Sequence, residues 1–142
     1  TMYSNFFVRE NTLMMKIQMR SNDIFFGLTF DAPFFSFLMQ SVYHILLKDY
    51  PDLKLGHYFH YADNLHFYER HFELAEAIVN DNVSEDHSFM LRKAFIDYND
   101  GKVRLSSTAR DFVSRIDEAA GSKSVDYKSI LADYFILDND SN

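Results

Sequence analysis

The chain has 142 residues, 47% of them apolar, which is the commonest size for a single domain that buries about two thirds of its unfolded surface. A formal net charge of -7 excludes a general nucleic-acid binder, because neutralising a phosphate backbone needs clustered Lys and Arg. These residues contain no cysteine, so they form no disulfide, no cysteine-ligated zinc site and no catalytic thiolate, and the composition predicts a cytoplasmic protein.

The amino-terminal part of the chain predicts a β-hairpin. A first strand is expected from Tyr3 to Val8, and Asn11 is typical of a tight turn. From Met14 to Ser21 apolar and polar residues alternate, which is the period of a strand with one buried face.

The most apolar stretch, Ile24 to Leu47, is long enough to span a membrane, but it is interrupted by Asp31, Pro33, Gln40 and His44. We therefore expect a buried strand, a turn and a buried helix from Pro33 to Lys48, and no membrane span. Asp31 or Ala32 would lie near the cap of that helix.

The remainder of the chain predicts one more strand and a series of helices. Positions 50–56 form a connection; the strand is expected at 57–62, and the helices at 65–80, 86–98, 106–120 and 126–137, with turns at 99–101 and 121–122. The prediction is a single α+β domain with a mixed sheet and a long buried helix, followed by short helices. Residues 1–81 would form its main portion, 82–137 a helical extension of the same domain, and 138–142 a tail.

Two polar features could carry chemistry. The string Met19 to Asp23 brings a guanidinium, a hydroxyl and an amide to a strand end, where they could bind an anion; the alternative is a solvated strand end with a surface ion pair. Asp31 is a carboxylate inside an apolar run, which is costly unless the group is paired or caps the helix.

The histidines do not predict a metal site, because none of them shows the helical spacing of a zinc motif with its acidic partner. The six are His44, His57, His60, His66, His71 and His87. His44 would lie on the buried helix, where we expect a hydrogen-bonded core histidine.

Four blocks in order resemble the thymidylate synthase family, and together they cover about the first half of the chain. NFFV at 5–8, MRSND at 19–23, GLTFD at 27–31 and GHYFHYADNLHFYERH at 56–71 match the family's QFYV, QRSxD, GxPFN and GDFxHxxGDxHxYxNH. The spacing of the first three blocks is kept, and a few residues are inserted around 50–53. Met19 and Asp63 replace a glutamine and a glycine of the family pattern.

The resemblance implies a site for a pyrimidine deoxynucleoside monophosphate. By analogy, Arg20 and Ser21 of the second block bind the phosphate and Asp23 belongs to the same site. His66 and Tyr68 contact the deoxyribose hydroxyl; their spacing of two fits the extended entry to a helix better than its body.

Asp31 stands where the family's asparagine reads the pyrimidine edge. Uracil offers an acceptor O4 and a donor N3–H, which an amide matches, whereas cytosine offers a donor amine and an acceptor N3, which a protonated carboxyl group matches. Burial would favour that protonated form. The same exchange distinguishes the family's deoxycytidylate hydroxymethylases, so the resemblance favours dCMP over dUMP.

The family's chemistry uses a cysteine thiolate and 5,10-methylenetetrahydrofolate to transfer a one-carbon unit to pyrimidine C5. In the family's frame that cysteine falls immediately before Thr1, so we expect no catalytic residue in this chain and only doubtful folate binding. The resemblance also implies a homodimer joined through a sheet face.

Two functions therefore stay open. The chain is a carboxy-terminal piece of a phage dCMP hydroxymethylase-like enzyme, or it is a non-catalytic, truncated family member that serves as a binding or oligomerisation scaffold. A third possibility, that the blocks are packing features of the fold alone, predicts that Arg20, Ser21, His66 and Tyr68 do not share a cleft.

Overall fold

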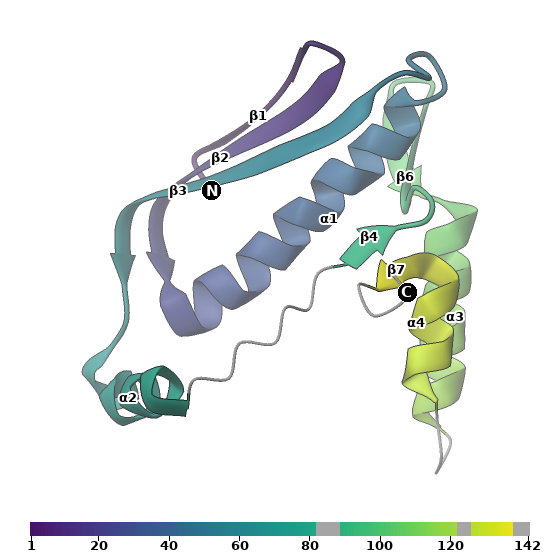
Figure 1. Cartoon of the computed structure of the whole chain (residues 1–142). Coiled ribbons are helices and arrows are strands. Elements are labelled where there is room, and N and C mark those ends of the chain that lie inside the picture. The colour runs from purple at the N-terminus through teal and green to yellow at the C-terminus, as the bar shows by residue number, and fades with distance from the viewer. Residues whose placement is uncertain (82–88, 122–125, 138–142) are drawn as a thin grey trace.

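The computed structural model describes residues 1–81, 89–121 and 126–137, with a three-stranded sheet packed on one long helix. Figure 1 shows the strands β1 (Tyr3–Arg9), β2 (Thr12–Asp23) and β3 (Lys54–His66) lying along one side of helix α1 (Thr29–Leu46). The sheet order is β1-β2-β3, with β1 antiparallel and β3 parallel to β2. The predicted α+β class with a mixed sheet is confirmed. The tail predicted at 138–142 lies outside the described residues.

The turn between β1 and β2 follows from its two residues. Glu10 and Asn11 have φ values of 49° and 57°, the left-handed conformation that both central residues of a tight hairpin turn need. The turn fixes the register, which places Phe6 opposite Met15 on the face toward the helix. The predicted hairpin is confirmed.

The connection from β2 to α1 differs from the prediction. Residues 24–28 form a π-helical turn, η1 (Ile24–Leu28), in place of a strand, and it runs directly into α1. The helix begins at Thr29, four residues before Pro33. Pro33 therefore lies inside the helix, where it removes one backbone donor.

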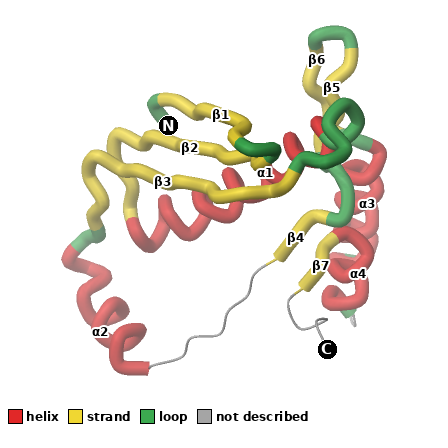
Figure 2. Tube along the Cα trace, turned by 45° about the horizontal axis from the view of Figure 1, so that its top comes forward, coloured by secondary structure: helices red, strands yellow, loops and turns green. Residues whose placement is uncertain are grey.

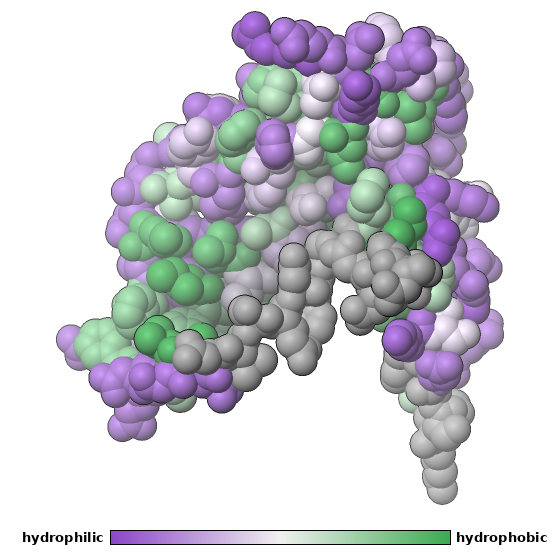
Figure 3. Space-filling view, in the orientation of Figure 1, coloured by the Kyte–Doolittle hydropathy of each residue, from purple (hydrophilic) through white to green (hydrophobic). Residues whose placement is uncertain are grey.

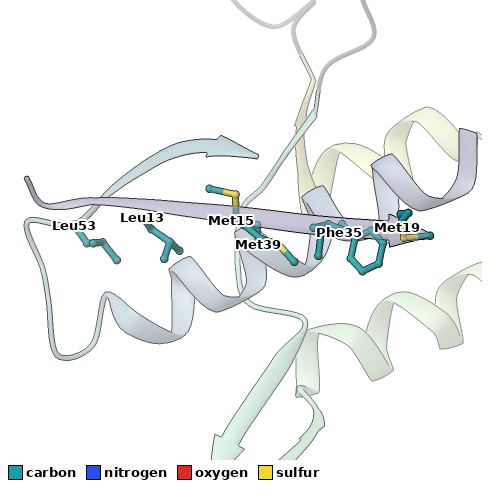
Figure 4. Close-up of a cluster of buried hydrophobic side chains, with 7 residues drawn as sticks. Leu13, Met15, Met19, Phe35, Met39 and Leu53 are labelled. Carbon is teal, nitrogen blue, oxygen red and sulfur yellow. The ribbon is translucent and has the colours of Figure 1, made fainter. Parts of the chain in front are cut away.

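The core lies between β2 and α1, as Figure 4 shows. Alternate residues of β2 point into it, which confirms the period-2 prediction. The buried members are Leu13, Met15, Ile17 and Met19 from β2, Phe35 and Met39 from α1, and Leu53 from the loop before β3. These residues anchor the strand whose far end carries the candidate anion-binding groups.

Strand β3 is longer than predicted, so the helix that follows it begins at a later residue than predicted. Its pairing with β2 shifts register between Leu13 and Met15, where Gly56 lies so close to β2 that a Cβ would be 2.7 Å from the Leu13 carbonyl oxygen. Leu65 still pairs with Asn22. The helix predicted from Leu65 therefore begins only with the 3₁₀ turn η2 (Glu69–His71) and α2 (Phe72–Asp81).

The last third contains short strands as well as helices. The elements are β4 (Phe89–Leu91), β5 (Ile96–Asn99), β6 (Lys102–Leu105), α3 (Ser107–Ala120), α4 (Tyr127–Tyr134) and β7 (Phe135–Leu137). The helix predicted at 86–98 is wrong over its described residues, because β4 pairs with β7 and β5 forms a hairpin with β6 that projects from the molecule in Figure 2. The helix at 106–120 is confirmed, with Ser106 accepting from the Ala109 amide as N-cap. The helix predicted at 126–137 ends at Tyr134.

Two polar side chains of helix α1 form hydrogen bonds with the last third of the chain. Gln40 Oε1 accepts from the Leu91 amide at 2.5 Å, and His44 Nε2 donates to the Leu91 carbonyl at 2.7 Å. Leu91 belongs to a second buried cluster with Phe95, Ala109 and Tyr134. The expected hydrogen bond of His44 is confirmed, with a partner on a distant strand.

Within the described ranges, none of the helices combines the length and the apolar character needed to cross a membrane.

Candidate functional site

The parallel pairing of β2 and β3 brings their carboxyl ends side by side. Ser21 lies opposite Asn64, and Asp23 lies opposite His66. Residues separated by about 45 positions in sequence thus meet at one edge of the sheet, beyond the end of the buried core. Ser21 and His66 of the predicted phosphate and sugar groups are brought together there.

The side chains of Ser21 and His66 are within hydrogen-bond distance of each other at this edge. His66 Nδ1 lies 3.4 Å from the Asn64 carbonyl oxygen and 3.3 Å from Ser21 Oγ. Because a carbonyl only accepts, Nδ1 carries the proton and Ser21 Oγ is a second acceptor. The hydroxyl hydrogen of Ser21 is then available to donate to an anion.

Tyr68 lies just after the end of β3, next to His66. Its backbone is extended, with φ -91° and ψ 151°, and its ring meets the His66 ring edge-on at 5.4 Å. Arg70 lies over the Tyr68 ring at 4.7 Å and donates to His71 Nε2 at 3.2 Å. The sequence argument missed Arg70, although a cation two residues from the HxY pattern was the visible signal.

Arg20 is exposed at the same edge. It lines a pocket of about 360 Å³ together with Thr1, Met2 and Ser21. No carboxylate of the described part of the chain forms an ion pair with the Arg20 guanidinium. An unpaired guanidinium beside a hydroxyl that can donate is a combination that binds a phosphate or carboxylate.

Asp23 has a structural role that the sequence did not predict. Its Oδ1 accepts from the Phe25 and Phe26 amides at 2.8 and 3.2 Å, which caps η1. Loss of hydration acts to raise the pKa of Asp23, but these two amides and the nearby His66 and His71 lower it by more, so the net shift is downward. A contact between Asp23 and a substrate stays a prediction.

Asp31 does not cap the helix, so the N-cap interpretation is wrong. The cap position of α1 is Leu28, and Asp31 lies in the first turn, partly buried. Its negative charge acts on Tyr58 of β3: burial first, and the charge of Asp31 second, raise the pKa of Tyr58 to about 12. Asp31 is therefore close enough to β3 for its charge to act on Tyr58. Its contact with a base stays a prediction.

Apolar surface flanks this end of the molecule. Figure 3 shows it over the start of α1 and along α2. Phe26, Phe30 and Phe34 are 59%, 70% and 59% exposed, well beyond what a buried helix would show. In the part of the chain that the structure describes, no three His, Cys, Asp or Glu side chains are grouped so as to hold a metal ion.

The chain is similar to thymidylate synthases, both by its family and by individual relatives. The sequence profile of the thymidylate synthase family matches residues 1–107. Thymidylate synthases of Buchnera aphidicola subsp. Acyrthosiphon pisum, strains Tuc7, 5A and APS, are each 34% identical to this chain over 71 residues. That stretch is 50% of this chain and 25% of each relative, so the chain matches about a quarter of the length of these proteins. The family match extends through β6 to the first residue of α3, beyond the blocks that carried the resemblance.

Proposed function

Because the chain belongs to the thymidylate synthase family, we propose that it binds a pyrimidine deoxynucleoside monophosphate at the joined ends of β2 and β3. One observation carries the proposal: the unpaired Arg20 guanidinium lies beside Ser21, whose hydroxyl is free to donate when its oxygen accepts from His66. The phosphate occupies the Arg20 and Ser21 side. His66 and Tyr68 contact the deoxyribose.

We further propose that dCMP binds more tightly than dUMP, through Asp31. A protonated carboxyl group donates to cytosine N3 and accepts from the exocyclic amine, whereas uracil presents the opposite pattern. Leaving a buried polar group unmatched costs about 1–3 kcal/mol, so the wrong base is rejected by about tenfold or more. The position of Asp31 in the first turn of α1, partly buried and near enough for its charge to act on Tyr58, supports this role.

The proposal for this chain is binding, not turnover. The family uses methylenetetrahydrofolate and a thiolate, and these 142 residues supply no cysteine. The pocket of about 360 Å³ at Arg20 is at the small end of ligand sites, which span roughly 300–1,000 Å³. This pocket is lined by Thr1, Met2, Arg20 and Ser21, which suits the phosphate end of a nucleotide, and no step is derived through the folate.

Calorimetric titration with dCMP and dUMP tests the proposal. The wild-type chain is expected to bind dCMP at least tenfold more tightly, and Asp31→Asn to reverse the preference by giving the amide that matches uracil. Asp49→Asn makes the same change of charge beyond the opposite end of α1, where the side chain is exposed, and is expected to change neither affinity. Absence of binding by the wild type would overturn the proposal, and an unaltered ratio in Asp31→Asn would overturn the role of Asp31.

We also propose that the chain self-associates through the sheet face opposite α1. Tyr3 and Tyr61 are 47% and 48% exposed there, with the Lys16 ammonium between their rings. In Figures 1 and 2 none of the described helices covers this face. Sedimentation velocity is expected to show a mass that rises with concentration, and Tyr61→Glu to abolish the rise. A constant monomer mass for the wild type would contradict this.

A further inference from the structure

Tyr58, His60 and Asn22 form a line of polar contacts that joins β3 to the end of β2. The Tyr58 hydroxyl is hydrogen-bonded to His60 Nδ1, and the two rings meet edge-on at 5.8 Å. On the other side of the same ring, His60 Nε2 lies 2.8 Å from Asn22 Nδ2. Asn22 is only 3% exposed, so the line is anchored in the interior at the end of β2.

Beyond Tyr58 lies the face of α1 that carries Asp31. Phe35 lies one helical turn after Asp31 on the same face of α1, and its ring is 6.4 Å from the ring of Tyr58. Tyr58 is therefore a β3 side chain that this face of α1 meets. The effect of the Asp31 charge on the pKa of Tyr58, which reaches about 12, agrees with that placement. At neutral pH the Tyr58 hydroxyl keeps its proton.

The contacts define a direction for the hydrogen bonds. The amide nitrogen of Asn22 is a donor, so His60 Nε2 accepts and the ring proton lies on Nδ1. Nδ1 then donates to the Tyr58 oxygen, and the hydroxyl hydrogen of Tyr58 is available for the Asp31 carboxyl group. Gly27 makes room for this arrangement, because a Cβ there would lie 1.9 Å from Asn22 Oδ1.

We propose that Tyr58, held by His60 and Asn22, positions the Asp31 carboxyl group for base recognition and so determines the preference for cytosine. The proposal rests on the nucleotide-binding function proposed above. A carboxyl group whose one oxygen accepts from Tyr58 is held in a single orientation, in which its donor and acceptor can both meet the base edge. Tyr58 is a positioning residue here, because it acts through Asp31.

The test is the ratio of dCMP to dUMP affinity in Tyr58→Phe. Removing one hydrogen bond to a carboxyl group is expected to lower this ratio about tenfold while the ring and its packing stay in place. Tyr98→Phe is the matched control, since Tyr98 is 59% exposed on β5, and it is expected to keep the wild-type ratio. Equal thermal unfolding of the two variants would show that Tyr58→Phe is folded.

A second measurement does not depend on nucleotide. In a chain with ¹³C-labelled tyrosine rings, the Tyr58 resonance is expected to titrate well above its ordinary pKa in the wild type and closer to that pKa in Asp31→Asn. An unmoved titration would overturn the proposed contact. Wild-type preference retained by Tyr58→Phe would overturn this proposal alone, and wild-type binding of neither nucleotide would overturn the function and this inference with it.

Discussion

Replacing Arg20 with alanine is expected to weaken dCMP binding about a hundredfold, the largest effect predicted for any single change at the site. A guanidinium holds a phosphate through two parallel, charge-assisted hydrogen bonds. Because Arg20 is exposed, solvent weakens them to about 2.7 kcal/mol together, which corresponds to a hundredfold. Arg20 is exposed and has no carboxylate partner among the described residues, so its removal leaves no unpaired charge behind and its loss reports on the ligand alone. Calorimetry with dCMP at low salt measures the change.

Two further variants sharpen that result. Arg20→Lys keeps the charge but not the planar fork, so it is expected to recover only part of the lost affinity. Arg104→Ala removes an exposed arginine of β6, distant in sequence from the site, and is expected to leave the affinity within twofold of wild type, about 0.4 kcal/mol. If Arg20→Ala bound dCMP as the wild type does, the phosphate would have to lie elsewhere.

Ile17→Ala is expected to lower the free energy of unfolding by about 2–5 kcal/mol, the largest predicted loss of stability. Ile17 is fully buried between β2 and α1, and shortening it opens a cavity in the only layer of packing between sheet and helix among the described residues. Met15, Met19 and Met39 belong to the same cluster, and flexible thioethers move into such space. The loss should therefore fall in the lower half of the range.

Urea unfolding followed by circular dichroism measures this loss as a shift of the midpoint. Val103→Ala is the matched control: it also shortens a β-branched residue, but Val103 is 66% exposed on β6, so a change within about 0.5 kcal/mol is expected. A midpoint for Ile17→Ala equal to that of the control would mean that the β2–α1 layer does not hold the domain together.

The first half of the fold could be predicted because its signals are local. The alternation along β2 and the turn residues at Glu10 and Asn11 determine the hairpin without any distant partner. The segment around Leu91 and Phe95 could not be predicted in that way. Its apolar residues lie four apart, which suits a helix, but β4 pairs with β7 and the two side chains are buried by α1, α3 and α4, so distant partners decide the structure.

In the candidate site, too, the local features could be predicted and the contacts between distant residues could not. The sequence placed His66 and Tyr68 in an extended segment, which the structure confirms, because a spacing of two is read from the chain itself. It gave no sign of the contacts among Asn22, Tyr58 and His60, because β2 and β3 are joined by a long crossover and only their register brings these side chains together. The roles of these residues toward a nucleotide stay predictions.

The hydrogen bonds between α1 and Leu91 have a consequence for synthesis on the ribosome. Gln40 and His44 precede Leu91 by 51 and 47 residues. At about 5–20 residues per second, a helix already able to pack on its sheet waits roughly 3–10 s for that strand to be made. During this interval the face of α1 that later meets Leu91 and Phe95 is exposed on the nascent chain. Chaperones that bind nascent apolar segments would therefore have access to this face during that interval.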